Sequence, residues 1–213
     1  MPFWSYIIVA VAAYLLGSIP TGFLVAKGRG VDLQKSGSGN IGATNAMRVL
    51  GKPMGIFVLL MDVLKGFAAV WLCNFLLQIF NAPAAGLENY RIVAGIFAVL
   101  GHNYPCWLKF KGGKGVATTT GVYLALAPEA LAVALAVFVL ALLLTKYVSV
   151  GSILAAVALP AAVWFTKEDF FLRMVTIALG IMAILKHRKN IQRLMAGTES
   201  RLGEKSQPVE VAK

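Results

Sequence analysis

The chain alternates between long apolar runs and short polar segments. Seven apolar runs occur in this order: Trp4 to Ala26, Met54 to Phe80, Ile92 to Leu108, Val116 to Ala127, Ala130 to Leu144, Val148 to Phe165 and Phe170 to Leu185. A helix needs about 20 mainly apolar residues to cross the hydrocarbon core of a bilayer. The pattern therefore predicts an all-α polytopic membrane protein with seven transmembrane helices, of which two come from short runs.

The break between the fourth and fifth runs decides the number of crossings. It rests on Pro128-Glu129, because proline is costly inside a helix and a charge is costly in lipid. The alternative is a single kinked helix, which would leave six crossings. The two interpretations differ in which side of the membrane each polar segment faces.

The basic residues favour seven crossings. With the N-terminus outside, 16 of the 20 Lys and Arg residues fall in four segments that face the cytoplasm. These segments are the loop between the first two runs, the loop after the third run, Lys146, and the tail after the seventh run. Six crossings would place the first loop and the tail on opposite sides, against the excess of Lys and Arg in cytoplasmic loops. We therefore expect the N-terminus outside and the C-terminus in the cytoplasm.

Composition supports a membrane protein and narrows the chemistry. Hydrophobic residues make up 59% of the 213 residues and charged residues 14%, with a mean hydropathy of +0.77, which excludes an ordinary soluble domain. The net charge of +11 suits nucleic acid, anionic lipid or an acidic substrate, and the positions of the charges favour membrane and phosphate. Cys73 and Cys106 lie in apolar runs, which excludes a disulfide framework. With two histidines in the chain, we expect no metal centre and no cofactor.

The first cytoplasmic loop is rich in glycine and small polar residues. It reads Ser36-Gly-Ser-Gly-Asn-Ile-Gly-Ala-Thr-Asn45 and is followed by Arg48. Its glycines fit the G-x-G-x-x-G spacing of dinucleotide folds, but an apolar helix precedes them where that fold needs a strand. Glycines let backbone N–H groups converge on an anion, and Arg48 supplies a planar fork for phosphate. The candidate ligands are Gly37, Ser38, Gly39, Asn40, Gly42, Thr44, Asn45 and Arg48. The alternative is a tight turn with helix caps.

A second cytoplasmic loop again places glycines around basic residues at the start of a helix. It reads Phe110-Lys-Gly-Gly-Lys-Gly-Val-Ala-Thr118. It is not a Walker A loop, because Gly115 occupies the Ser/Thr position that would hold magnesium. Lys114 and the backbone N–H groups of Gly112, Gly113 and Gly115 could hold a phosphate. The alternative is an anchor of basic residues at the membrane surface, which leaves the three glycines unexplained.

The third candidate segment follows the last apolar run. It reads Lys186-His-Arg-Lys-Asn-Ile-Gln-Arg193, and its default interpretation is a set of basic side chains at the membrane interface. His187 and Asn190 are three residues apart, so on a helix they share a face and can both turn toward a site.

Three further polar residues lie inside apolar runs. Asp62 and Lys65 are one helical turn apart and neutralise each other, as a buried charge in lipid requires. A functional site and a pair that fixes helix packing remain equal alternatives for them. We expect His102 to be a cap or interface residue and not a catalyst.

These loops together resemble the bacterial membrane acyl-phosphate:glycerol-3-phosphate acyltransferases. The resemblance runs from about residue 14 to residue 197 and rests on six segments in order: Gly-Ser-Ile-Pro-Thr-Gly at 17–22, the loop at 37–45, Asp62 to Gly66, Gly-His-Asn-Tyr-Pro at 101–105, the loop at 110–118, and His-Arg-Lys-Asn-Ile-Gln-Arg at 187–193.

The resemblance implies an enzyme that moves a fatty acyl group from acyl phosphate to the sn-1 hydroxyl of glycerol 3-phosphate, giving lysophosphatidic acid. It implies one seven-helix domain over residues 1–197, with its site at the cytoplasmic face of the bacterial inner membrane, and a polar cytoplasmic tail over 198–213. It further implies a soluble phosphate acyltransferase that supplies the acyl phosphate. We expect membrane lipid and the two phosphate substrates, and no nucleic acid, as partners.

The resemblance also assigns roles to residues. Ser38, Thr44, Arg48, Lys114, His187 and Asn190 match the family's polar site residues. Arg48 and Lys114 would clamp the phosphate of glycerol 3-phosphate, while the glycine loops at 37–42 and 112–115 would hold the acyl phosphate and its oxyanion.

The general base stays open at this point. No Ser-His-Asp triad occurs in the sequence, so the substrate phosphate could take the proton, with His187 or Ser38 as the competing candidates. A different class of function, an organic-phosphate transporter or channel, is disfavoured by the odd helix count and by polar motifs that lie on one face. A structural protein that binds anionic lipid would explain the charge but not the glycines.

Overall fold

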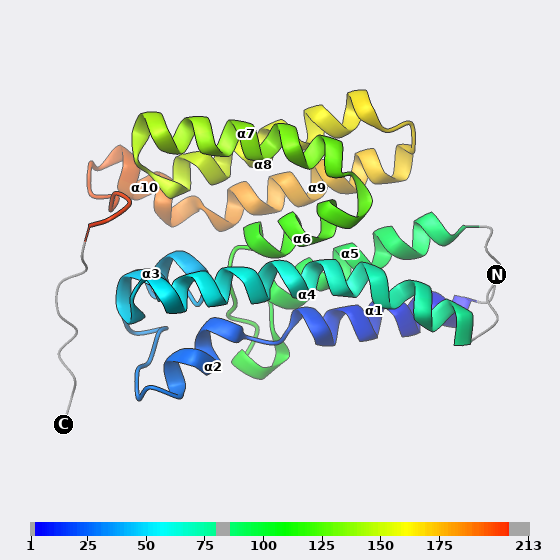
Figure 1. Ribbon diagram of the computed structural model, residues 1–213, viewed down its shortest axis with the longest axis horizontal. Helices are drawn as coiled ribbons and strands as arrows, with labels where there is room; N and C mark the ends of the chain where they lie inside the picture. Colours follow the sequence, from blue (N-terminus) through cyan, green and yellow to red (C-terminus); the bar gives the residue numbers. More distant parts are fainter. Residues whose placement is uncertain (1–2, 80–85, 205–213) are drawn as a thin grey trace.

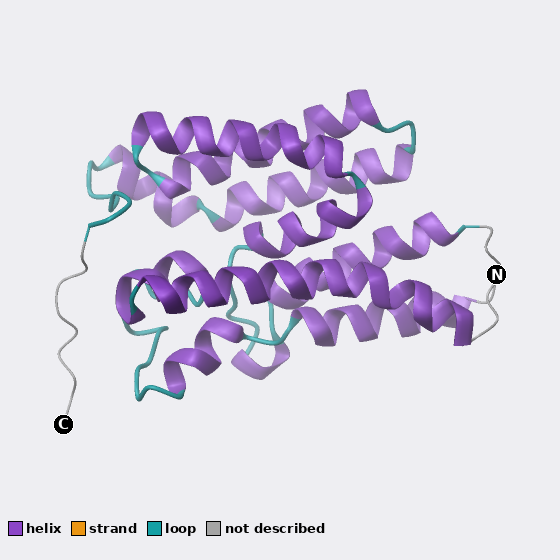
Figure 2. Cartoon of the chain, in the orientation of Figure 1, coloured by secondary structure: helices purple, strands orange, loops and turns teal. Residues whose placement is uncertain are grey.

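The computed structural model describes residues 3–79 and 86–204, and within them it is helical with no strand (Figure 1, Figure 2). Those residues form ten α-helices and one 3-10 helix: α1 (Phe3–Gly17), α2 (Thr21–Lys27), α3 (Ala43–Leu50), α4 (Lys52–Ile79), α5 (Leu87–Asn103), η1 (Cys106–Leu108), α6 (Val116–Leu126), α7 (Pro128–Thr145), α8 (Val148–Thr166), α9 (Phe170–Lys186) and α10 (Arg188–Met195). The expected all-α class is therefore confirmed. Phe80, where the second run was expected to end, and residues 205–213 of the tail lie outside the described residues.

The long helices form two groups in an elongated bundle. In one group α1 packs on α5 and α4 packs on α6, and in the other α7, α8 and α9 lie together (Figure 1). Glycines allow the close approach inside the first group, since a Cβ on Gly121 of α6 would strike Val63 O of α4, and one on Gly101 of α5 would strike Tyr14 O of α1. Small residues at such contacts are typical of membrane helices, which pack by close fit.

Two prolines mark breaks in the helices. The first apolar run is not one helix, because α1 ends at Gly17 and α2 begins at Thr21, leaving the segment Ser18-Ile-Pro20 between them. Proline has no N–H to continue a helix ladder. At Pro128 the expected break is confirmed: Ala127 has φ −153° between α6 and α7, and the chain reverses direction there (Figure 1).

Four helical segments are long and apolar enough to cross a membrane: Trp4–Lys27, Lys52–Leu76, Pro128–Thr145 and Val148–Thr166. A fifth results if α9 and α10, which meet at an angle of 51°, count as one span. The 11 residues of α6 extend only about 16 Å, roughly half the hydrocarbon thickness. The described residues thus establish four to five candidate spans, fewer than the seven expected.

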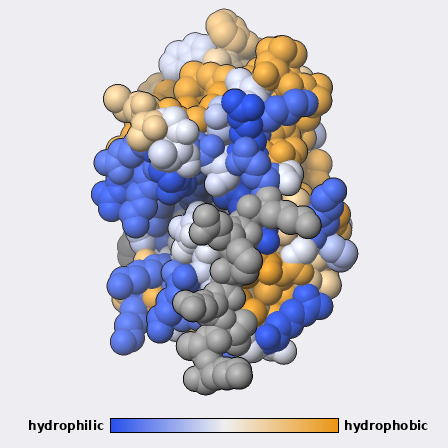
Figure 3. Space-filling model, turned by 90° about the vertical axis from the view of Figure 1, so that its left-hand side faces the viewer, coloured by the Kyte–Doolittle hydropathy of each residue, from blue (hydrophilic) through white to orange (hydrophobic). Residues whose placement is uncertain are grey.

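Polar segments collect at one end of the bundle. Helices α2, α3 and α10 lie at the left-hand end in Figure 1, and the turn from α7 to α8 reaches the same end. Figure 3 faces this end and shows hydrophilic residues across much of it, with hydrophobic residues along its borders. The helix flanks expose large apolar side chains such as Leu144 and Phe165, as expected for a lipid-facing surface. The charged end is therefore where a polar site can form.

Candidate active site

Asn45 organises the first glycine loop. It is buried in the first turns of α3, and its Nδ2 lies 2.8 Å from Asn40 O and 3.0 Å from Ser36 O. Its Oδ1 accepts a hydrogen bond from the Ser38 N–H at 2.9 Å. One side chain therefore holds both arms of the loop by their backbone. The Asn45 amide therefore stabilises the loop, whereas the sequence predicted direct contact with a ligand.

Gly37, Ser38 and Gly39 form the exposed part of this loop, and the Gly39 N–H donates back to Ser36 O at 3.0 Å. Gly37 and Gly39 have φ of 59° and 71°, a conformation that side chains disfavour, and Asn40 Oδ1 accepts from the Gly42 N–H at 2.8 Å. Gly42 precedes α3, and no side chain caps the helix start. Ser38 is exposed and Thr44 half-buried, so both hydroxyls lie where an anion could approach the start of α3.

The second glycine loop rests on the end of α5. Gly113 N–H donates to His102 O at 3.1 Å, and Gly112 N–H donates to Asn103 O at 3.3 Å. A Cβ on Gly113 would strike His102 Nε2, so the chain passes directly over the imidazole. Gly115 has φ 84° and starts α6. The three glycines therefore let the loop lie flat against α5, and this packing explains their clustering better than a surface anchor does.

Lys114 joins this loop to the third segment. Its Nζ donates to Asn190 Oδ1 at 2.6 Å, although the two residues are 76 positions apart. Asn190 Nδ2 donates in turn to Glu199 Oε1 at 2.7 Å, and Arg193 Nε meets Glu199 Oε2 at 2.7 Å. The bend after α9 turns α10 across the end of the bundle, which brings Asn190 over the glycine loop. The second and third predicted segments therefore meet.

Arg48 brings the first segment to the same place. Its Nη2 donates to Ser200 O at 3.2 Å, next to Glu199 in the chain. Burial lowers the pKa of Arg48 and of Lys114, in the latter case to about 8, while the nearby Glu199 opposes both shifts. Burial would raise the pKa of Glu199, but hydrogen bonds from Asn190 and Arg193 hold it below its usual value. The site is a cluster of half-buried cations around one buried carboxylate.

His187 follows the last residue of α9 and is 2% exposed. Its Nδ1 lies 2.8 Å from Ala183 O, and because a carbonyl oxygen only accepts, Nδ1 carries the proton and Nε2 is left as an acceptor. Burial, with a contribution from Lys114, lowers the pKa of His187 to about 4. His187 is therefore a neutral imidazole at physiological pH, able to accept a hydrogen bond but weak as a base.

Comparison with known proteins identifies the family. The family model described as glycerol-3-phosphate acyltransferase matches residues 7–197. The chain belongs to this family. A glycerol-3-phosphate acyltransferase of Geotalea daltonii is 44% identical over 92% of this chain and 97% of its own length, and one of Synechococcus sp. (strain JA-3-3Ab) is 45% identical over 96% and 98%.

Solved structures share the fold. The crystal structure of PlsY, an integral membrane glycerol 3-phosphate acyltransferase, in its glycerol 3-phosphate form has a TM-score of 0.84 and 38% identity, over 93% of this chain and 96% of that chain. Its lysophosphatidic acid form has a TM-score of 0.81 and 37% identity over the same shares. The chain is therefore an integral membrane acyltransferase, and the resemblance found in its sequence motifs is confirmed.

Three residues that sequence reasoning did not single out also belong to this cluster. Glu199 is 8% exposed and accepts from Asn190, and Arg193 shares its carboxylate. Ser149, buried at the start of α8, lies beside the same carboxylate. A signal for Glu199 existed in the sequence, since it is an acidic residue in a strongly basic segment, preceded by Gly197.

The positive φ of Gly39 gives a first prediction. Gly39→Ala should lower acyltransferase kcat/KM at least about ten-fold, because a Cβ would lie 3.0 Å from Gln34 O and shift the loop's N–H groups. Gly30→Ala is a matched control, since Gly30 has φ 72° but no atom within 4 Å of its Cβ position, so it bears the same backbone strain without the contact. Equal activity of the two purified variants would contradict the prediction.

Proposed function

We propose that this acyltransferase moves a fatty acyl group from acyl phosphate to the sn-1 hydroxyl of glycerol 3-phosphate, releasing lysophosphatidic acid and phosphate. The observation that carries this proposal is the meeting of a cation cluster with an apolar pocket at Lys114 to Val116. Arg48, Lys114 and the two glycine loops supply donors for two phosphate groups. Solved relatives in glycerol 3-phosphate and lysophosphatidic acid forms support the acceptor and the product.

The acyl chain lies in a pocket between α6 and the group α7, α8 and α9. At one end the pocket is lined by Val116, which follows the glycine loop, and by Ala183, which is one turn before His187. Apolar residues form most of the lining: Val116, Leu131, Ala134, Leu135, Phe138, Ala155, Ala156, Leu159, Leu179 and Ala183. An acyl chain held here has its carboxyl end at the cation cluster, where the transfer takes place.

The transfer needs a clamped acceptor and a stabilised oxyanion. Arg48 and Lys114 hold the phosphate of glycerol 3-phosphate. The Gly112 and Gly113 N–H groups donate to the end of α5, so the backbone N–H groups of Lys114 and Gly115 stabilise the charge that develops on the acyl carbonyl oxygen. The C1 hydroxyl oxygen attacks the acyl carbon, and the ester bond forms as the bond from that carbon to the phosphate oxygen breaks. Ser38 and Thr44 supply hydroxyl donors beside the first loop.

The leaving phosphate takes the hydroxyl proton. His187 has a pKa of about 4 and is therefore too weak a base to remove the proton unaided, although its Nε2 can orient the hydroxyl. The Glu199 carboxylate is already paired with Asn190 and Arg193. Acyl phosphate is a mixed anhydride with a good leaving group, so positioning and electrostatics can supply the catalysis without a strong protein base.

We further propose seven passes through the bacterial inner membrane, with the N-terminus outside and the site facing the cytoplasm. The helices α4 to α9 alternate in direction along the bundle, α1 and α2 both run toward the end with the site, and the first and last described residues lie at opposite ends (Figure 1). The segments with most of the Lys and Arg residues lie at the same end of the bundle as the site, which agrees with the excess of Lys and Arg in cytoplasmic loops. This orientation exposes the site to a soluble enzyme that makes acyl phosphate.

The donor is tested with purified protein in lipid vesicles and radiolabelled glycerol 3-phosphate. Palmitoyl phosphate, palmitoyl-CoA and palmitoyl carrier protein are offered separately, and we expect labelled lysophosphatidic acid from palmitoyl phosphate alone. Product formed from a thioester at a comparable rate would reject the proposed donor. Label that enters the vesicle unacylated would support a transporter.

The lowered pKa of Lys114 predicts a pH dependence. Lys114 is charged below a pKa of about 8 and loses its charge as the pH rises through that value, so kcat/KM for glycerol 3-phosphate should fall above about pH 8. Lys114→Arg keeps its charge at all these pH values and should remove that fall, at some cost in fit. A pH profile that is the same for both proteins would contradict the role of Lys114.

The pocket predicts a change in chain-length preference. Ala155 lines the pocket, and Ala155→Leu reduces the space in it, so the KM for palmitoyl phosphate should rise several-fold relative to a shorter acyl phosphate, while the KM for glycerol 3-phosphate stays unchanged. Ala161→Leu makes the same change on the exposed face of α8 and serves as the control. Equal preference in the two variants would place the acyl chain elsewhere.

A further inference from the structure

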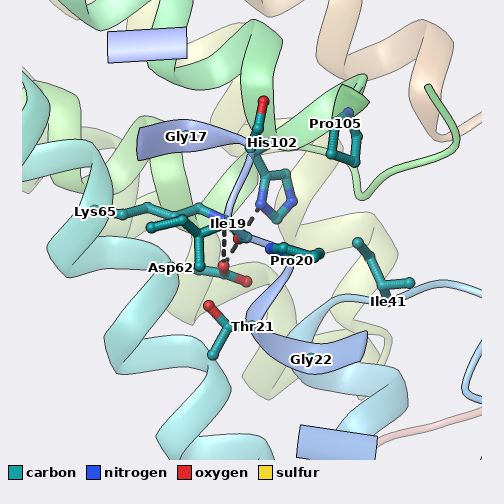
Figure 4. A pocket seen from close by; sticks show the side chains of 11 residues that line it. Gly17, Ile19, Pro20, Thr21, Gly22, Ile41, Asp62, Lys65, His102 and Pro105 are labelled. Atoms are coloured by element: carbon teal, nitrogen blue, oxygen red, sulfur yellow. Dashed lines mark hydrogen bonds and ion pairs between the residues drawn. The ribbon is translucent and has the colours of Figure 1, made fainter. Parts of the chain in front are cut away.

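Two charged side chains and an imidazole are buried together beneath the loops of the site (Figure 4). Asp62 and Lys65 lie on α4, and His102 lies in the last turn of α5; their exposed fractions are 2%, 6% and 5%. Asp62 Oδ1 is 2.7 Å from Lys65 Nζ and 3.6 Å from His102 Nδ1. The expected pairing of Asp62 with Lys65 is thus confirmed, and Asp62 is the point where the three side chains meet.

This cluster holds the break in the first apolar run. Lys65 Nζ donates to Ile19 O at 2.9 Å, a carbonyl that lies in the segment between α1 and α2. The cluster lines a small pocket together with Pro20 and Ile41. A Cβ on Gly22 would strike Ile41 O, so the end of the first glycine loop lies against α2. One arm of the first loop therefore rests on this cluster.

The second loop rests on the opposite edge of His102. The imidazole lies between Asp62 on one side and the backbone of Gly113 on the other, because Nδ1 faces Asp62 and a Cβ on Gly113 would strike Nε2. His102 O also accepts from the Gly113 N–H. The next residue is Lys114, which reaches Asn190 across the site. A shift of the imidazole would therefore move the loop and the Lys114 backbone with it.

Stability alone does not account for these charges. Burying an ion pair costs desolvation, and replacing such a pair by apolar residues of similar size is often neutral or stabilising. A charged residue in an apolar span is costly for the same reason. Lys65 contacts Ile19 in the break before α2, and Asp62 contacts His102 under the second loop. The pair is therefore placed where it can hold both loops.

We propose that Asp62, Lys65 and His102 are positioning residues that set the two phosphate-binding loops of the site. They do not contact the reacting atoms. They set the position of Lys114 and its neighbouring N–H groups relative to the first loop. The inference rests on the proposed binding of glycerol 3-phosphate by Lys114.

The test replaces the pair by apolar residues of similar shape. In Asp62→Leu/Lys65→Met we expect an unchanged or higher thermal unfolding midpoint in detergent, together with a rise in the KM for glycerol 3-phosphate of about 10- to 100-fold. The KM for palmitoyl phosphate should change far less, because its acyl chain is held between α6 and α7 to α9. A role in packing alone would not separate the two KM values.

A matched control removes an ion pair elsewhere. Glu129 and Lys167 pair at 3.3 Å between the start of α7 and the residue after α8, at the other end of the bundle. Glu129→Leu/Lys167→Met should leave both KM values unchanged. If the Asp62/Lys65 double variant also keeps wild-type KM values and kcat, the inference is overturned.

A second variant decides the matter if the double variant does not fold. His102→Gln leaves the Asp62–Lys65 pair intact but removes the imidazole between Asp62 and Gly113, and it should raise the KM for glycerol 3-phosphate selectively. Normal KM values in this variant overturn the inference. Lys114→Ala is measured in parallel: if it too binds glycerol 3-phosphate normally, the proposed function of Lys114 fails, whereas a defect in Lys114→Ala alone rejects only the positioning role.

Discussion

The hydrogen bond from Lys114 Nζ to Asn190 Oδ1 joins the two groups of helices at the charged end of the bundle. Lys114 precedes α6 of the first group, and Asn190 follows α9 of the second. Asn190 donates a hydrogen bond to Glu199, and Arg193 forms an ion pair with the same carboxylate. Because an unpaired buried charge is strongly destabilising, each member of this chain constrains the next. The position of α10 across the end of the bundle follows from that constraint.

The electrostatics of the cluster favour a dianionic ligand. Arg48, Lys114 and Arg193 share one carboxylate, Glu199, so the cluster keeps an excess of positive charge. A phosphate brings the missing negative charge and accepts hydrogen bonds from an arginine fork and an ammonium at once. Since water is displaced from buried groups, each such bond is stronger here than at an exposed surface. A weakly basic His187 fits this picture, because a cation-rich site disfavours a further positive charge.

Much of this site can be predicted from the sequence, for identifiable physical reasons. Glycines beside Arg48 and Lys114 predict an anion site in each of the two loops, and both side chains reach the segment at Asn190 to Ser200. The three-residue spacing of His187 and Asn190 correctly predicts two polar groups that turn inward, as both are buried. Sequence patterns are sufficient for these features because each depends on residues that are close together in the chain.

Other features depend on contacts that no local pattern contains. Asn45 looks like a ligand in the sequence, yet its amide holds the loop, because Leu33, Ser36 and Asn40 present carbonyls to it. Glu199 reaches the cluster through the bend after α9 and the turn at Gly197, whose φ is 68°.

The number of crossings also depends on contacts between helices. A short apolar run such as that of α6 can be supported by α4, which packs against it through Gly66 and Gly121. Because α6 is short, the glycine loop and Lys114 lie beside the apolar pocket, which Val116 lines from the first turn of α6. A longer helix at this position would move the loop away from the pocket that we propose for the acyl chain. The short α6 therefore suits the proposed site, which must bring a phosphate group to a lipid chain.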